Sequence, residues 1–187
     1  MKQERLHKIL LGVTGASGML FLKGFLESIS GMDIIIHGVC SSAGEKVLRM
    51  EQSMVVQDLP VVSKWYDIHD MAASPASGSS DYTSMVILPC TMGTLASIAG
   101  GMSINLIHRA ADVMLKERKR LVLAVRETPL NRTHLLNMLA VHDAGATLCP
   151  TMPSYYLKPK NLEEAAKTYA WRLADQLSID IPNRKRW

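Results

Sequence analysis

Apolar and polar positions alternate along the chain in two different rhythms. Short, nearly continuous apolar runs bounded by Gly, Pro, Thr or Ser are typical of buried strands, and they occur at residues 9–13, 33–39, 85–88, 121–125 and 146–149. Between and after these runs, apolar residues recur with helical spacing at residues 19–30, 42–50, 95–99, 106–116, 133–142 and 161–177. The pattern predicts strands that alternate with helices.

This alternation favours an α/β fold, a three-layer, doubly wound parallel sheet that helices cover on both faces. Ligands bind such sheets at the carboxyl ends of the strands. The segments that follow the strands are therefore the candidate functional loops, at residues 14–18, 40–42, 89–94, 126–129 and 150–156. Residues 57–82 show neither rhythm, and an irregular stretch of that length in a compact domain is usually functional or disordered.

Length and composition fit one globular domain, residues 1–187. With 48% hydrophobic and 20% charged residues, the chain can bury a single substantial core. Cys40, Cys90 and Cys149 form no C-x-x-C pair, which favours reduced thiols and a cytoplasmic location. The six histidines show no metal-binding spacing, and no apolar run approaches the roughly 20 residues of a membrane-spanning helix. We therefore expect neither a bound metal nor a membrane partner.

The net charge of +4 raises the question of a nucleic-acid partner. Arg184, Lys185 and Arg186 supply three of these four charges, so the rest of the chain is nearly neutral and carries no long basic stripe. We therefore expect no nucleic acid as a partner. The basic tail is either solvated or binds an anion.

A glycine-spaced loop follows the first predicted strand and leads into the first predicted helix. Gly12, Gly15 and Gly18 have the spacing G-x-x-G-x-x-G, which is neither the P-loop nor the dinucleotide fingerprint. Backbone N–H groups at the start of a helix bind anions, so the loop is a candidate site for a nucleotide-like ligand. A structural turn is the alternative, and the strand before and helix after favour the ligand.

Further polar residues follow other predicted strands. Residues 89–94 combine hydroxyl groups with a glycine and form either a ligand-binding loop or a helix N-cap. Arg126 and Glu127 follow the apolar run at 121–125; an arginine can bind phosphate through two N–H groups, and a glutamate can act as acid or base. A surface salt bridge is the alternative for this pair. Arg109 and Lys116 lie on one face of a predicted helix, from which both could reach a common anion.

Taken together, these segments resemble the flavin prenyltransferase family of the UbiX type over nearly the whole chain. The resemblance is carried by the ordered runs at 15–18 (GASG), 75–79 (PASGS), 90–96 (CTMGTLA), 105–107 (NLI), 109–113 (RAADV), 115–118 (LKER), 126–130 (RETPL) and 153–156 (PSYY). Each run is weak evidence alone, but the ordered set is specific. The resemblance implies a flavodoxin-like (Rossmann-like) fold and an enzyme that joins dimethylallyl phosphate to N5 and C6 of reduced FMN, without a metal. It also implies a separate decarboxylase that receives the prenylated FMN, and a homo-oligomer built from trimers, a dodecamer.

The resemblance also implies a role for individual residues. The residues implied to bind FMN are Gly15, Ala16, Ser17, Ser41, Thr91, Met92, Gly93, Thr94 and Arg126. Those implied to bind the prenyl donor are Arg109, Lys116, Tyr156, Arg172 and Trp187, and those implied to be catalytic are Ser17, Glu51, Lys116 and Glu127. Trp187 ends a C-terminal segment, about residues 179–187, that is expected to close over the site as a lid. The chain departs from the family pattern at Tyr155, where Phe is usual, at Leu157, where His is common, and before residue 75, where some members have a Trp.

Two other functions stay open. One is an FMN-dependent decarboxylase acting on peptidyl-cysteine, which is disfavoured because residues 75–80 read PASGSS rather than Pro-Ala-Ser-Ala-Asn-Thr. The other is a non-catalytic flavin carrier or an accessory subunit of a decarboxylase complex. The joint presence of Lys116, Glu127, Tyr156 and Arg172 is hard to explain for a mere carrier.

Overall fold

A single parallel sheet organises the protein, whose computed structural model describes residues 7–185. The strands are β1 (His7–Val13), β2 (Ile34–Cys40), β3 (Val62–Tyr66), β4 (Ser84–Cys90), β5 (Arg120–Val125) and β6 (Thr147–Leu148). Every pair in the order β3-β2-β1-β4-β5-β6 is parallel. The predicted α/β class with a doubly wound parallel sheet is confirmed.

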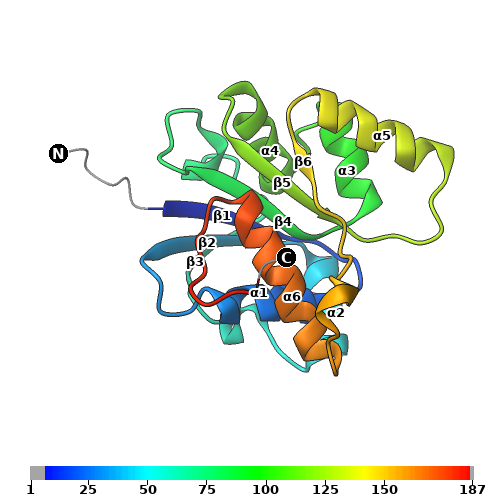
Figure 1. Cartoon of the computed structure of the whole chain (residues 1–187). Helices are drawn as coiled ribbons and strands as arrows, with labels where there is room; N and C mark the ends of the chain where they lie inside the picture. The colour runs from blue at the N-terminus through cyan, green and yellow to red at the C-terminus, as the bar shows by residue number, and fades with distance from the viewer. Residues whose placement is uncertain (1–6, 186–187) are drawn as a thin grey trace.

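Helices cover both faces of this sheet and bury a separate core against each (Figure 1). One layer consists of α1 (Met19–Ser28), α2 (Ser42–Gln52) and α6 (Leu162–Gln176); the other consists of α3 (Met92–Ala99), α4 (Leu106–Lys116) and α5 (Arg132–Asp143). Phe25 and Tyr169 are among the large side chains buried in the first core, and Tyr82 in the second. Aliphatic residues and Met make up most of both cores.

The prediction that residues 57–82 are irregular throughout is wrong, because this stretch contains β3. β3 pairs with β2 at the edge of the sheet, and its Ser63 and Lys64 are exposed. An edge strand with polar residues lacks the continuous apolar run that marks the buried strands. The five predicted strands keep the flavodoxin-type order, and β3 extends it by one strand to the 3-2-1-4-5-6 order.

The strand order reverses between β1 and β4, and the chain leaves these two strands toward opposite faces of the sheet. In doubly wound folds, the crevice at such a reversal is where ligands bind. Thr14, only 3% exposed, links the two strand ends here. Its hydroxyl donates to the Pro89 carbonyl at 2.8 Å and accepts from the Thr91 N–H at 2.9 Å. The fold therefore holds the loops after β1 and β4 together.

Candidate functional site

The loop between β1 and α1 depends on two of its glycines. A Cβ at Gly15 would lie 2.5 Å from the Cβ of Ala43, so only glycine lets this loop approach the first turn of α2. Gly18, just before α1, has a φ of 109°, a conformation that L side chains rarely adopt. The glycine spacing thus has a structural reason, and it leaves Gly15, Ala16 and Ser17 at the carboxyl edge of the sheet.

The anion at the amino end of α1 is a side chain of the protein itself. The Glu51 carboxylate, from the end of α2, accepts hydrogen bonds from the backbone N–H groups of Gly18 at 2.9 Å and Met19 at 2.8 Å. The Ser17 hydroxyl also donates to this carboxylate. Two of the predicted catalytic residues, Ser17 and Glu51, are therefore in direct contact.

This environment keeps Glu51 ionised. Partial burial alone would raise its pKa, but hydrogen bonds from Ser17, Met19 and Gly18, together with the positive charge of Arg126, outweigh burial and hold the pKa below its ordinary value. The carboxylate therefore serves as a hydrogen-bond acceptor at neutral pH.

Two further helices begin at the same edge, and the start of each offers N–H donors. Ser41 caps α2, where its hydroxyl accepts from the Gly44 N–H at 3.0 Å, and Thr91 caps α3 in the same way through the Thr94 N–H at 3.2 Å. The first N–H groups of a helix lack partners within the helix. A Cβ at Gly93 would meet only the Thr91 hydroxyl, at 4.0 Å, so the start of α3 is open to a ligand.

Arg126 and Glu127 follow β5 at this carboxyl edge. The Arg126 N–H donates to the Cys90 carbonyl at 3.2 Å, which fixes the start of the loop beside the end of β4. Both residues line a cavity of about 250 Å³ whose other walls include Met92, Met138 and Met152. Glu127 is exposed, and its carboxylate accepts from the Thr128 N–H at 3.1 Å. Arg126 is thus half-buried, whereas the neighbouring carboxylate of Glu127 is exposed.

Tyr156 and Arg172 meet in a second small cavity, of about 290 Å³. Tyr156 lies in the short 3-10 turn Tyr155–Leu157, and Arg172 lies on α6. Arg184 and Lys185 from the C-terminal segment line the same cavity. Neither of these two residues was selected from the sequence as a site residue. Their place in the basic tail was the only signal available.

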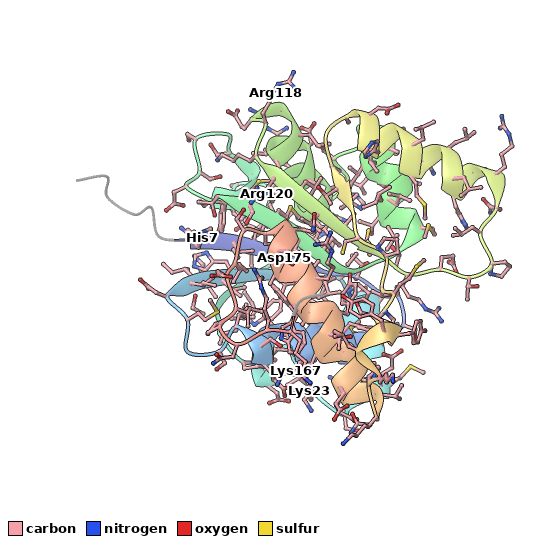
Figure 2. The ribbon with its side chains drawn as sticks, viewed as in Figure 1. His7, Lys23, Arg118, Arg120, Lys167 and Asp175 are labelled. Carbon is pink, nitrogen blue, oxygen red and sulfur yellow. The ribbon has the colours of Figure 1, made fainter. Side chains whose placement is uncertain are left out.

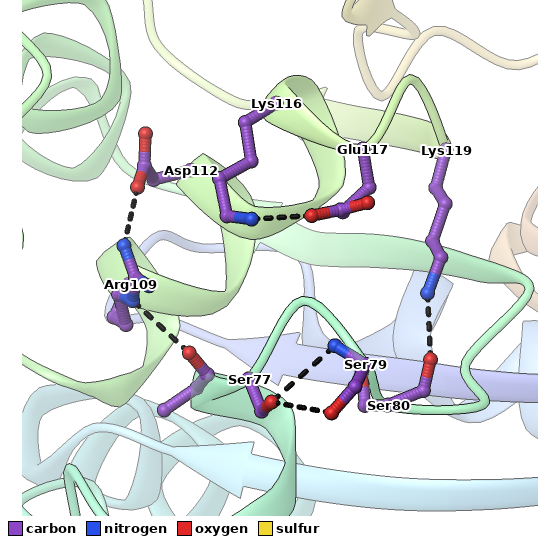
Figure 3. Close-up of polar contacts among 9 residues, drawn as sticks. Ser77, Ser79, Ser80, Arg109, Asp112, Lys116, Glu117 and Lys119 are labelled. Atoms are coloured by element: carbon purple, nitrogen blue, oxygen red, sulfur yellow. Dashed lines mark hydrogen bonds and ion pairs between the residues drawn. The ribbon is translucent and has the colours of Figure 1, made fainter.

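Arg109 and Lys116 lie on one helix, α4 (Figure 3). This helix begins near the carboxyl edge of the sheet, where the Leu106 N–H donates to the Ile68 carbonyl just beyond β3, and it ends at Lys116 near the amino end of β5. Arg109 donates to the Ala76 carbonyl at 3.1 Å and pairs with Asp112 at 2.7 Å. Lys116 pairs with Glu117, which lowers the pKa of that carboxyl below its ordinary value. A Cβ at Gly78 would lie 2.6 Å from the Lys116 ammonium, so the 75–79 loop packs directly under this cation.

Within one chain, Lys116 and Arg126 cannot meet. α4 leads into the amino end of β5, whereas Arg126 follows its carboxyl end. A strand rises about 3.3 Å per residue, so β5 alone keeps these ends on the order of 17 Å apart. The structure thus brings together Ser17, Glu51 and Arg126 at one edge, and it places Lys116 at the other. Arg109 lies one turn into α4, between the two edges.

The comparisons with known proteins agree with one another. Residues 1–169 match the family model described as Flavoprotein. The flavin prenyltransferase UbiX of Deinococcus radiodurans is 42% identical over 181 residues, covering 96% of this chain and 93% of that protein. The UbiX of Methanothermobacter thermautotrophicus is 39% identical, covering 96% and 94%. The chain belongs to the UbiX-type flavin prenyltransferase family of flavoproteins.

Solved structures of this family superpose closely on the chain. AnUbiX (PadA1), crystallised with FMN and dimethylallyl pyrophosphate, has a TM-score of 0.94 at 37% identity and 98% coverage of both chains. A dodecameric protein from Escherichia coli O157:H7, described as an FMN-dependent UbiX-like decarboxylase, has a TM-score of 0.92 at 34% identity, covering 96% and 98%. The cypemycin decarboxylase CypD, with a TM-score of 0.59 at 15% identity, shares the fold alone.

The carboxyl edge of this UbiX-type chain fits FMN. The open start of α3 at Gly93 leaves room for a flat ring, and the N–H groups that begin α2 and α3 suit a phosphate. The amino end of α1 does not suit one, because Glu51 already occupies it. Over residues 7–185, no group of three or more His, Cys, Asp or Glu side chains could hold a metal ion.

Two other predictions concern the ends of the chain and the membrane. Trp187, the predicted prenyl-donor contact, lies outside the described residues. The described part of the predicted lid packs on the body of the protein, where Ile179 and Ile181 are buried in the α6 core. None of the helices within residues 7–185 combines the length and hydrophobicity that a membrane span requires.

Proposed function

We propose that this protein is a flavin prenyltransferase that joins dimethylallyl phosphate to N5 and C6 of reduced FMN. The observation that carries the proposal is the meeting of the starts of α2 and α3 with Arg126 and the Ser17–Glu51 pair at one edge of the sheet. The sequence identity to UbiX enzymes over nearly the whole chain supports it. Reduced FMN supplies the two nucleophilic atoms, and phosphate is the leaving group.

The residues at the carboxyl edge divide the work of binding FMN. Thr91, Met92, Gly93 and Thr94 offer the first turn of α3, and Ser41 the first turn of α2, to the flavin phosphate and its chain. Gly15, Ala16 and Ser17 form the floor next to the ring. Arg126 places a fixed positive charge beside the ring, where the leaving phosphate and the reduced flavin both carry negative charge.

A second set of residues holds the prenyl donor. Tyr156 and Arg172 line a cavity that suits a phosphate group. The guanidinium of Arg172 and the phenol of Tyr156 are both hydrogen-bond donors that bind phosphate oxygens. Glu127 and Glu51, whose carboxylate contacts Ser17, are the two carboxylates assigned to the reacting atoms, where they would accept protons as the new ring closes. Arg109 and Lys116 complete the set from a neighbouring subunit.

The need for a neighbouring subunit follows from the two edges of the sheet. Lys116 lies at the amino edge, so it reaches a flavin at the carboxyl edge only if that flavin belongs to another chain. Leu130 and the α5 residues Leu135, Leu136 and Leu139 are 44–56% exposed, an apolar face of the kind that subunit contacts cover. We therefore include a homo-oligomer in the proposal, a trimer-based dodecamer like the assembly described for the Escherichia coli protein.

Product use and location complete the proposal. The prenylated FMN would pass to a separate decarboxylase that uses it as a cofactor. We place the protein in the cytoplasm, which the free thiols of all three cysteines support. Burial raises the pKa of the Cys90 thiol to about 12, so this residue stays protonated beside the flavin loop.

The test is a single anaerobic incubation. The purified protein is mixed with reduced FMN and dimethylallyl phosphate, and the mass of the flavin is then measured by mass spectrometry. The expected product is FMN carrying one five-carbon unit. Unmodified flavin would refute the proposal. Release of carbon dioxide from an added aromatic acid, without any adduct, would favour a decarboxylase instead.

A further inference from the structure

Asp175 lies near the end of α6 (Figure 2). Its carboxylate pairs with two guanidinium groups, those of Arg184 and Arg172. One of its oxygens is 2.5 Å from a terminal nitrogen of Arg184, and the other is 3.5 Å from a terminal nitrogen of Arg172. A contact at 3.5 Å is at the outer limit of a hydrogen bond. Asp175 therefore pairs with Arg184 and only weakly with Arg172.

Arg184 is held in place from several sides. Its side chain is only 7% exposed, and its second terminal nitrogen lies 2.9 Å from the Asp180 carboxylate. It also donates to the Ile179 carbonyl at 3.4 Å. A buried arginine between two carboxylates is a fixed group, unlike Arg172, whose side chain is 67% exposed.

The same residues line the cavity to which the proposed function assigns the phosphate of the prenyl donor. Arg172, Arg184 and Lys185 bring three positive charges to this cavity, and Asp175 brings one negative charge. Asp175 follows Arg172 by three positions on one helix, a spacing that allows a full ion pair. A guanidinium in such a pair has fewer N–H groups left for phosphate oxygens. How far Arg172 can bind phosphate thus depends on what else Asp175 binds.

We propose that Arg184 is a positioning residue that binds Asp175 and thereby keeps Arg172 available to the phosphate of the prenyl donor. The inference rests on the proposed function, which assigns that phosphate to Tyr156 and Arg172. Arg184 itself does not touch the reacting atoms. Its effect is on affinity for the donor, because without it Asp175 turns to Arg172 and competes with the phosphate.

The test compares single and double variants of the full-length, FMN-loaded protein. Arg184→Met keeps the length of the side chain but removes its charge, and dimethylallyl phosphate binding is measured by calorimetry. Affinity is expected to fall about tenfold, which corresponds to the loss of one charge-assisted hydrogen bond. Adding Asp175→Asn to the same chain is expected to restore affinity to within about threefold, because the competing carboxylate is then gone.

A purely structural role for Arg184 predicts a different pattern. If Arg184 only ties residues 179–185 to α6, then Asp175→Asn alone breaks that tie and weakens binding, and the double variant shows no recovery. That result would overturn the inference. If Arg184→Met does not fold, Asp175→Asn and Arg184→Lys decide the matter: both are expected to bind like the wild type, and a tenfold loss in either refutes the inference.

The readout separates this inference from the proposed function. Inorganic phosphate serves as a second probe in the same variants, with Arg172→Gln as the control that should abolish its binding. If phosphate follows the expected pattern but reduced FMN forms no adduct, the proposed function fails and the inference stands. If the adduct forms but adding Asp175→Asn to Arg184→Met does not restore affinity, the inference fails and the proposed function stands. A wild type that binds neither probe refutes the inference.

Discussion

The Glu51 carboxylate accepts a hydrogen bond from the Met19 backbone N–H at 2.8 Å, at the point where α1 begins. Because Glu51 ends α2, this contact ties the end of one helix to the start of another. A carboxylate at a helix N-terminus is stabilised by the helix dipole and by the N–H groups that lack partners there. The same carboxylate contacts Ser17, so the tie also fixes the loop assigned to the flavin.

We expect Glu51→Gln to destabilise the protein at pH 7 by about 1 kcal/mol, since the exposed glutamine keeps one acceptor but loses the charge at the helix terminus. The pKa of Glu51 is lowered in the folded state, so its contribution is present above the ordinary value of 4.5 and is lost as the pH falls through the folded value. Urea unfolding at pH 7 and pH 3 checks this.

The control is Glu27→Gln, which removes an exposed carboxylate at the other end of α1 and should show no loss of stability at pH 7. An equal deficit for Glu51→Gln at both pH values would contradict the electrostatic explanation.

Thr14→Val is expected to destabilise the protein by about 1–3 kcal/mol, because it keeps the shape but leaves the Pro89 carbonyl and the Thr91 N–H without their hydroxyl partner. FMN binding should weaken as well, since Thr91 caps the helix assigned to the flavin. Thermal unfolding and flavin titration measure the two effects. Thr14→Ser retains the hydroxyl and should behave nearly as the wild type. Equal losses in both variants would mean that the methyl group, not the hydrogen bonds, matters.

Two glycines should respond to alanine in opposite ways. Gly15→Ala places a methyl group against Ala43, and overpacking of this kind costs about 1–3 kcal/mol. The added methyl group of Gly93→Ala meets open space at the start of a helix, so this change should leave stability unchanged or raise it by up to about 1 kcal/mol.

We nevertheless expect Gly93→Ala to weaken FMN binding, because the methyl group occupies the space assigned to the flavin. Chemical unfolding without flavin, followed by flavin titration, separates the effects. Full FMN affinity in Gly93→Ala would remove this glycine from the site.

Subunit mixing tests whether the two edges meet in an oligomer. Lys116→Gln and Arg126→Met should each be inactive alone. When the two variants are mixed and reassembled, statistical pairing gives about a quarter of the sites both intact residues, so about a quarter of the wild-type adduct rate should return. The control mixes a chain carrying both changes with the Lys116→Gln chain, which can assemble no intact site. Mixed oligomers that native mass spectrometry detects but that stay inactive would contradict the arrangement.

Much of the fold could be predicted because buried strands and amphipathic helices have distinct sequence patterns. β1 and β5 each consist mainly of a continuous apolar run, and they lie within one or two residues of their predicted bounds. β3 was missed because Ser63 and Lys64 face solvent at the edge of the sheet, so its pairing with β2 leaves no apolar run. The start of α3 was predicted three residues late, because the cap at Thr91 was only one of two interpretations of that loop.

The site was less accessible to sequence reasoning than the fold. That Glu51 occupies the start of α1 depends on a contact across 33 positions, and no local pattern encodes it. The same holds for Arg184 and Asp175, whose pairing requires the chain to turn back after α6. The placement of Lys116 could have been deduced from topology, because a helix between two parallel strands must return the chain to their amino ends.

The division of the site between the two ends of β5 has a consequence for newly synthesised protein. Under the proposed arrangement, a chain that has just folded already carries its flavin edge but receives Lys116 only when it docks onto a neighbour. Isolated chains would therefore store flavin without consuming prenyl donor. Dilution to isolated chains should abolish turnover while the flavin stays bound. Assembly of the oligomer would therefore activate the enzyme.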